Sequence, residues 1–189
     1  MTIAFAAVVL AGGAARRLGG VDKLRLPVGD RSLLERTLDA VAGADPVVVV
    51  GPRREVAHRV AWTREDPPGG GPLAGLSAGL AALSADVELV AVLAADHPHL
   101  TPGTVSRLLA AVGPAQGAVL VDADGVPQWL VGVWRGQALR AAMPADVRDR
   151  SVRGVLGALA PVQLPAVGAE ASDVDTPDDL RRSRGQFSG

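Results

Sequence analysis

The sequence predicts an α/β domain with a mostly parallel central sheet. Short, nearly continuous apolar runs recur along the chain, and segments with helical spacing of apolar residues lie between them. Such runs are typical of strands that are covered on both faces, and their alternation with helices is typical of parallel sheets. The 189 residues suffice for one domain with a substantial core, and 48% hydrophobic residues exclude global disorder.

Apolar runs predict strands at residues 3–10, 46–51, 88–95 and 117–121. Single apolar stripes predict helices at residues 32–42, 75–83 and 104–112. The runs at 131–134 and 161–165 are expected to add edge or antiparallel strands. A last helix is expected to begin after Thr176, which can serve as its N-cap, with Pro177 at the first helical position.

Charge and composition restrict the partners. A formal net charge of −1 argues against binding to a nucleic-acid backbone. The sequence has no cysteine, which excludes disulfides, thiolate metal sites and cysteine nucleophiles. The run at residues 3–10 is too short to cross a bilayer, and arginines follow it where a signal peptide would have them in front. We therefore expect a cytoplasmic protein that binds neither nucleic acid nor membrane.

The segment after the first strand is the first candidate site. Residues 10–23 read LAGGAARRLGGVDK. Gly12 and Gly13 allow a ligand to approach the backbone closely, and Arg17 and Lys23 can neutralise a polyphosphate. Ligands of open α/β sheets bind beyond the carboxyl ends of the strands, where this segment lies. The spacing matches neither a Walker A loop nor a dinucleotide motif, so it predicts another kind of phosphate loop, with an ordinary glycine-rich turn as the alternative.

Two carboxylates are candidate magnesium ligands. Asp96 directly follows an apolar run, and a hard carboxylate at a strand end suits Mg²⁺, which needs only one or two protein ligands. The alternative role for Asp96 is that of a turn residue before Pro98. Asp175 precedes the last helix, where helix capping is as good an explanation as metal binding.

A proline- and glycine-rich loop between residues 64 and 75, REDPPGGGPLAG, is the third candidate. Asp66 could accept hydrogen bonds from a base or a ribose, and the glycines permit close backbone approach. An ordinary long surface loop is the alternative. In the second half, Trp129 is either a stacking platform for a flat ring or a core residue.

These motifs resemble one known family. LAGGxxxRxGGxDK, then Arg64-Glu65-Asp66, Gly71-Pro72-Leu73-Ala74-Gly75, Ala95-Asp96-His97-Pro98 and a final Asp173-Val174-Asp175-Thr176-Pro177-Asp178-Asp179-Leu180 are similar, in this order, to the molybdenum cofactor guanylyltransferases. The resemblance implies a single three-layer Rossmann-like domain over residues 1–189, of the nucleotide-diphospho-sugar transferase type. Its nucleotide-binding half would cover about residues 1–100 and its acceptor-binding half about residues 101–189.

The resemblance also implies an activity. GMP would pass from GTP to the phosphate of molybdopterin with release of pyrophosphate, and Mg²⁺ would be held by Asp96 and Asp175. The catalytic residues would be Lys23, Arg17 and Asp96. The nucleotide-binding residues would be Leu10, Ala11, Gly12, Gly13, Lys23, Asp66, Gly71, Pro72, Leu73, Ala74 and Gly75. Transient contacts with proteins that deliver molybdopterin, or with molybdoenzymes, would follow.

Three alternatives stay open at this point. CTP could replace GTP, although relatives that use CTP commonly carry alanine where this chain has Gly12. The acceptor could be another phosphorylated molecule, or the protein could bind nucleotide without catalysis. One departure from the family pattern is that Asp173 and Asp175 stand where relatives usually have asparagines, which would make the site more anionic.

Overall fold

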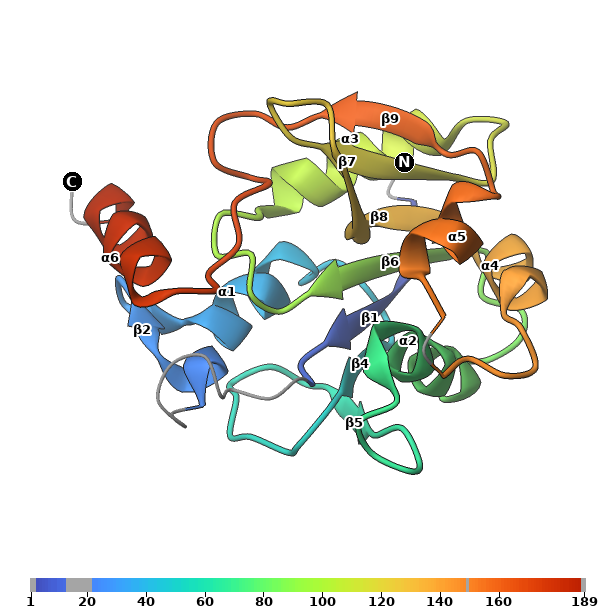
Figure 1. The fold of residues 1–189 in the computed structure, drawn as a ribbon, viewed down its shortest axis with the longest axis horizontal. Helices are drawn as coiled ribbons and strands as arrows, with labels where there is room; N and C mark the ends of the chain where they lie inside the picture. Colours follow the sequence, from blue (N-terminus) through green and yellow to red (C-terminus); the bar gives the residue numbers. More distant parts are fainter. Residues whose placement is uncertain (1–2, 13–21, 149, 188–189) are drawn as a thin grey trace.

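A computed structural model describes residues 3–12, 22–148 and 150–187. It contains a seven-stranded sheet in the order β5-β4-β1-β6-β8-β7-β9, flanked by helices (Figure 1). The strands are β1 (Ala6–Leu10), β4 (Val47–Val50), β5 (Ala61–Thr63), β6 (Leu89–Ala94), β7 (Gly117–Val121), β8 (Pro127–Arg135) and β9 (Val162–Pro165). β2 (Pro27–Val28) and β3 (Arg31–Ser32) form a separate antiparallel pair.

The helices are α1 (Leu33–Ala40), α2 (Gly71–Ala81), α3 (Pro102–Val112), α4 (Gly136–Ala142), α5 (Val152–Gly157) and α6 (Pro177–Gln186), with a 3₁₀ turn η2 (Lys23–Arg25). None of the helices in the part of the chain described here is long and apolar enough to cross a membrane.

The sheet is mostly parallel, as the sequence predicts. β1 pairs in parallel with β4 and β6, and β4 pairs in parallel with β5. β8 runs antiparallel to both β6 and β7, which confirms the expectation of an antiparallel element near residues 131–134. The carboxyl ends of β1, β4 and β6 therefore meet at one edge of the sheet, and the segments that follow them face a common space.

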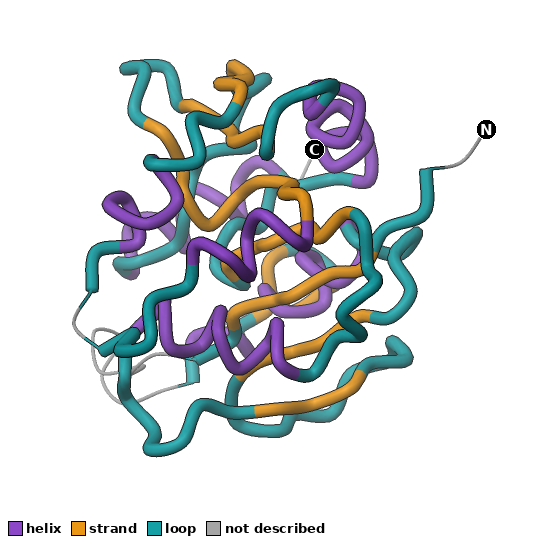
Figure 2. The backbone as a smooth tube through the Cα atoms, turned by 90° about the vertical axis from the view of Figure 1, so that its right-hand side faces the viewer, coloured by secondary structure: helices purple, strands orange, loops and turns teal. Residues whose placement is uncertain are grey.

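Helices cover both faces of the sheet, so the molecule has three layers (Figure 2). Side chains of β1 alternate between the two apolar clusters: Val9 packs with leucines of α1 and α3, and Val8 packs with leucines of α2, α4 and α5. This double coverage explains why the strands read as continuous apolar runs in the sequence. The three-layer architecture is confirmed.

Some expected boundaries are wrong. The first strand begins at Ala6, and Ile3 is exposed. α2 begins at Gly71 and not at residue 75, because Pro72 fits the first helical turn, where an N–H is not needed. The segment around His58 is irregular, and His58 Nε2 lies 2.8 Å from Asp39 Oδ1.

The connection from β9 to α6 is held by a buried carboxylate that the sequence did not reveal. Glu170 accepts hydrogen bonds from Thr104 Oγ1 at 2.6 Å and from the Val167 N–H at 2.8 Å. Arg107 Nη1 donates to both carboxylate oxygens of Glu170, at 2.8 and 2.9 Å. Burial opposes ionisation of Glu170, but the hydrogen bonds from Thr104, Val167 and Arg107 outweigh it and hold its pKa below the usual 4.5. This network fixes the chain that leads to Asp175.

Glu170→Gln should lower the free energy of unfolding near neutral pH by about 1–3 kcal/mol, because it removes hydrogen bonds to a charged group. A carboxyl with a depressed native pKa stabilises the fold above its unfolded pKa and loses this contribution as the pH falls through the native value. Urea unfolding between about pH 7 and pH 3 should therefore show a steeper acid loss for wild type than for the variant. Parallel pH curves would contradict this assignment.

Candidate functional site

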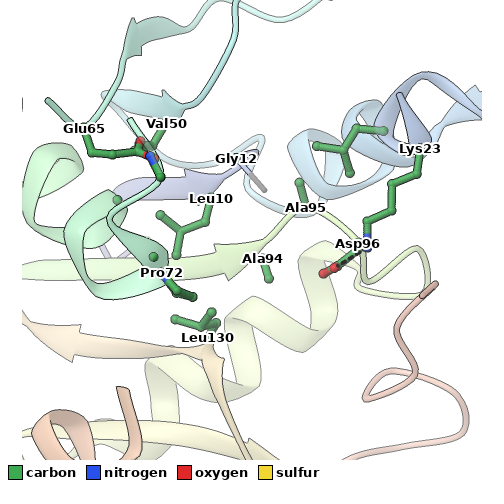
Figure 3. A pocket seen from close by; sticks show the side chains of 14 residues that line it. Leu10, Gly12, Lys23, Val50, Glu65, Pro72, Ala94, Ala95, Asp96 and Leu130 are labelled. Atoms are coloured by element: carbon green, nitrogen blue, oxygen red, sulfur yellow. Dashed lines mark hydrogen bonds and ion pairs between the residues drawn. The ribbon is translucent and has the colours of Figure 1, made fainter. Parts of the chain in front are cut away.

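A pocket of about 400 Å³ opens at the carboxyl ends of β1, β4 and β6 (Figure 3). Parallel sheets of this kind bind ligands in the same place, at the edge where the strands end. The lining residues come from the ends of β1, β4 and β6, from β8, from η2, from the loop before α2 and from the first turns of α2. They are Leu10, Gly12, Lys23, Leu24, Val50, Glu65, Gly69, Gly71, Pro72, Gly75, Ala94, Ala95, Asp96 and Leu130.

Lys23 is the centre of the polar side of this pocket. Its Nζ donates to Asp96 Oδ2 at 2.9 Å, to the Val174 carbonyl at 3.0 Å and to Asp175 Oδ1 at 3.0 Å (Figure 3 draws the first). Burial disfavours the charged form, but the Asp96 and Asp175 carboxylates outweigh it and raise the pKa of Lys23. The side chain is therefore a permanent cation at neutral pH. Lys23 is also the only lysine in the sequence.

Asp96 follows β6 directly and is held as a carboxylate. Burial favours its neutral form, but His97 and Lys23 outweigh this through hydrogen bonds and charge, and keep the pKa of Asp96 well below its usual range. His97 Nδ1 lies 3.2 Å from Asp96 Oδ1, while Lys23 contacts the other oxygen. Both oxygens are thereby oriented, and Asp96 is a side chain of the pocket and not a simple turn residue.

Asp175 reaches the site because its chain segment is bound to the end of β6. The Val174 N–H donates to the Asp96 carbonyl at 2.9 Å, which brings the segment before α6 against the segment after β6. The cap of α6 is made by Thr176 and Asp179, each of which accepts a hydrogen bond from the other's backbone N–H. Thr176 is thus the N-cap, as expected, and the Asp175 side chain is directed to Lys23.

The acids around Lys23 repel one another. Burial, with the negative charges of Asp175 and Asp96, raises the pKa of Asp173 above its usual value. A cation bound beside these acids would lower this repulsion.

The donor set fits a magnesium ion. Asp96 Oδ2 and Asp175 Oδ1 both lie within 3.0 Å of the Lys23 ammonium nitrogen, so two carboxylates lie close together beside the pocket. Mg²⁺ prefers such hard oxygens and completes its octahedron with water and phosphate. Among residues 3–12, 22–148 and 150–187, no group of three or more His, Cys, Asp or Glu side chains could hold a metal ion. Asp96 and Asp175 would therefore supply only two oxygen ligands, and substrate phosphate and water would supply the others.

Gly12 lines the pocket, and Gly51 lies directly beside it. An added Cβ at Gly12 would lie 3.9 Å from the Val50 carbonyl oxygen, an ordinary contact. Gly51 has a φ of +147°, and a Cβ there would lie 2.6 Å from the Ala11 carbonyl oxygen. Only glycine at position 51 therefore lets the end of β4 lie so close to the end of β1.

The structure brings most of the predicted residues together. Seven of the expected side chains or backbones line the pocket: Leu10, Gly12, Lys23, Gly71, Pro72, Gly75 and Asp96. Asp175 joins them through Lys23. Gly13 and Arg17, expected in phosphate binding and catalysis, lie outside the described residues.

Four expected nucleotide-binding residues have other positions. Leu73 is 1% exposed and packs in the core between α2 and the sheet, and Ala74 is also buried, because α2 begins before them. Ala11 is buried at the end of β1. Asp66 is exposed and lies outside the lining, whereas its neighbour Glu65 lines the pocket and accepts a hydrogen bond from the Gly69 N–H at 3.2 Å.

Trp129 is a packing residue. A Cβ added at Gly157 of α5 would lie 3.3 Å from the Trp129 ring, and this ring packs against the cluster that contains Leu139 and Leu156. Its neighbour Leu130 points into the pocket instead (Figure 3). The alternation of side chains along a strand accounts for this division.

The fold is shared with solved structures of nucleotidyltransferases. A nucleotidyl transferase from Methanothermobacter thermautotroptrophicus has a solved structure that superposes with a TM-score of 0.79, at 23% identity and with 97% of each chain covered. The sequence matches the family described as the MobA-like NTP transferase domain over residues 7–162, and the chain belongs to this family.

Curated relatives carry two different names. A probable molybdenum cofactor guanylyltransferase of Opitutus terrae is 39% identical over 127 residues, which are 65% of this chain and 62% of the relative. A phosphoenolpyruvate guanylyltransferase of Streptomyces scabiei is 40% identical over 138 residues, 70% of this chain and 62% of the relative. The matched part thus spans 62% of the length of each of these relatives.

Proposed function

We propose that the protein transfers GMP from GTP to the phosphate of molybdopterin and releases pyrophosphate. The observation that carries the proposal is the convergence of Lys23, Asp96 and Asp175 beside a pocket lined by Gly12 and the first turn of α2. A permanent cation and two oriented carboxylates at a glycine-rich backbone suit a metal-bound triphosphate. The name of the Opitutus relative supports the acceptor.

The chain's own groups would act by position and charge. The backbone at Gly12 and the N–H groups of the first turn of α2 would bind phosphate oxygens. Lys23 would stabilise the negative charge that builds up as pyrophosphate leaves, and we assign Arg17 to the same charge. Asp96 and Asp175 would hold Mg²⁺, which when bound neutralises phosphate oxygens and orients them.

No protein nucleophile is needed. An anionic oxygen of the acceptor phosphate forms a bond to the α-phosphorus of GTP, and the bond from that phosphorus to the bridging oxygen of pyrophosphate breaks. Pyrophosphate carries away the electron pair of the broken bond. Because the attacking oxygen is already deprotonated at neutral pH, holding the reactants in line supplies most of the rate enhancement.

The second candidate is transfer of GMP to phosphoenolpyruvate. The Streptomyces relative with this name is as similar as the Opitutus relative and matches a longer part of the chain. Both acceptors offer a phosphate monoester, so the same nucleotide site would serve either reaction. The difference would lie in the acceptor half, residues 101–189, from which Leu130 reaches the pocket.

The deciding experiment gives the purified protein Mg²⁺ and either GTP or CTP, with molybdopterin or phosphoenolpyruvate as acceptor. Pyrophosphate release and product mass are measured in all four combinations, with Asp96→Asn as the inactive control. We expect turnover with GTP and molybdopterin. Turnover with phosphoenolpyruvate alone would establish the second candidate, and a preference for CTP would overturn the nucleotide assignment. Nucleotide binding without any product would indicate a binding protein.

Gly12→Ala should change nucleotide choice without changing stability. The protein has room for the methyl group, so the melting temperature should stay as in wild type. The methyl group would instead meet the nucleotide, and one such group alters discrimination by about 1–3 kcal/mol. The ratio of kcat/KM for GTP to that for CTP should therefore fall by roughly tenfold or more. An unchanged ratio would show that position 12 does not select the base.

A further inference from the structure

Arg54 makes an unusually complete set of contacts outside the pocket. It lies in the segment after β4, and its guanidinium donates to both carboxylate oxygens of Asp22, from Nε at 2.7 Å and from Nη2 at 3.0 Å. The remaining nitrogen, Nη1, donates to the Ala11 carbonyl at 3.0 Å and to the Pro52 carbonyl at 3.1 Å. The Arg54 side chain is only 10% exposed, so water competes little for these bonds.

Asp22 connects this guanidinium to the catalytic lysine. It is the N-cap of η2, the turn that begins with Lys23, and its Oδ1 accepts from the Leu24 N–H at 3.3 Å. Burial favours the neutral form of Asp22, but Arg54 outweighs it and lowers the pKa of this carboxyl. One carboxylate therefore fixes both the start of the turn and its distance from Arg54.

Arg54 also contacts the chain just after β1, at Ala11. Ala11 precedes Gly12 of the pocket, and the Ala11 N–H donates to the Val50 carbonyl at 2.8 Å. Arg54 thus joins Ala11, which precedes Gly12, to Asp22, which precedes Lys23. Both Gly12 and Lys23 line the pocket. A bidentate guanidinium fixes direction as well as distance, which a lysine ammonium does not.

We propose that Arg54 is a positioning residue that aims Lys23 at Asp96 and Asp175 by holding Asp22 against the end of β1. The proposal rests on the proposed function for the role of Lys23 in transfer. Arg54 does not line the pocket, so it acts through Asp22 and the η2 turn and not on the substrate. Its loss should free the Lys23 ammonium while leaving Asp96 and Asp175 in place.

Because Lys23 is the only lysine, an amine-directed reagent reports on it directly. The test treats wild type, Arg54→Gln and Arg53→Gln with an N-hydroxysuccinimide ester at one pH and measures acylation of Lys23 relative to the amino terminus by mass spectrometry. Arg53 is the matched control because it is the exposed neighbour of Arg54. Leu139→Val, a buried change in α4, controls for a general loss of stability.

We expect Arg54→Gln to raise the rate of Lys23 acylation on the order of tenfold or more. The variant loses the hydrogen bonds from Arg54 to Asp22, so the η2 turn no longer holds the Lys23 ammonium against Asp96 and Asp175. Arg53→Gln and Leu139→Val should match wild type. Equal rates for Arg54→Gln and Arg53→Gln would overturn the proposal. An equal increase in Leu139→Val would overturn it too, because reduced stability alone would then account for the effect.

Kinetics separate this proposal from the proposed function. In an active protein, Arg54→Gln should lower kcat/KM for GTP by roughly the same factor as it raises Lys23 reactivity, and Arg54→Lys should recover only part of the loss. If wild type transfers nucleotide to neither acceptor, the proposed function fails, and the acylation rates still decide whether Arg54 positions Lys23.

Discussion

Replacing Lys23 by methionine should lower kcat/KM for GTP by about 10²–10³-fold, the range seen when a preorganised group that stabilises transition-state charge is removed. The side chain volume is nearly kept, but the cation that bonds Asp96, Asp175 and Val174 is lost. Steady-state kinetics with saturating acceptor and varied GTP measures the effect.

The matched control for this variant is Arg25→Met, which removes an exposed cation from the same η2 turn. It should keep wild-type kinetics. Lys23→Arg should retain part of the activity, because the charge remains while the length and hydrogen-bond geometry change. A Lys23→Met protein that folds and keeps full turnover would remove Lys23 from the mechanism.

Asp96→Asn should reduce turnover by at least about 10²-fold and raise the Mg²⁺ concentration needed for half-maximal rate, since a neutral amide is a weaker ligand for a hard cation. Activity is measured in a Mg²⁺ titration at fixed GTP. Asp86→Asn, an exposed change before β6, is the control and should titrate as wild type does.

Asp175→Asn belongs in the same titration. Thr176 and Asp179 cap α6 without the Asp175 side chain, so this variant should keep its melting temperature. A shifted Mg²⁺ requirement with unchanged stability would assign Asp175 to the metal. If Asp96→Asn and wild type respond equally to Mg²⁺, Asp96 is not a ligand, and an equal response of Asp175→Asn would exclude Asp175 in the same way.

The convergence of Lys23 and Asp96 could be predicted because it depends on sheet topology. β1 and β6 are neighbours and parallel, so the segments after them must meet at one edge. The apolar runs identified both strands, and the capping residues Thr176 and Pro177 identified the start of α6. These features are local in sequence, and periodicity or residue type reports them directly.

The contacts made by loops could not be predicted in the same way. Whether Glu65 or Asp66 faces the pocket depends on the backbone of a loop with several glycines and prolines, and neighbouring residues in such a loop can point in opposite directions. The partners of Arg54 and Glu170 lie far away in sequence and are set by tertiary packing. An isolated arginine or glutamate carries no pattern that identifies such a role.

The bond between the Val174 N–H and the Asp96 carbonyl has a consequence for biosynthesis. Lys23 is synthesised before its partner Asp175, which lies 152 positions later in the sequence. A growing chain can pair β1, β4 and β6 while the second carboxylate is still missing. The contact between Lys23 and Asp175 should therefore form only after Asp175 has left the ribosome, and a chain that ends before Val174 would lack the second carboxylate beside Lys23.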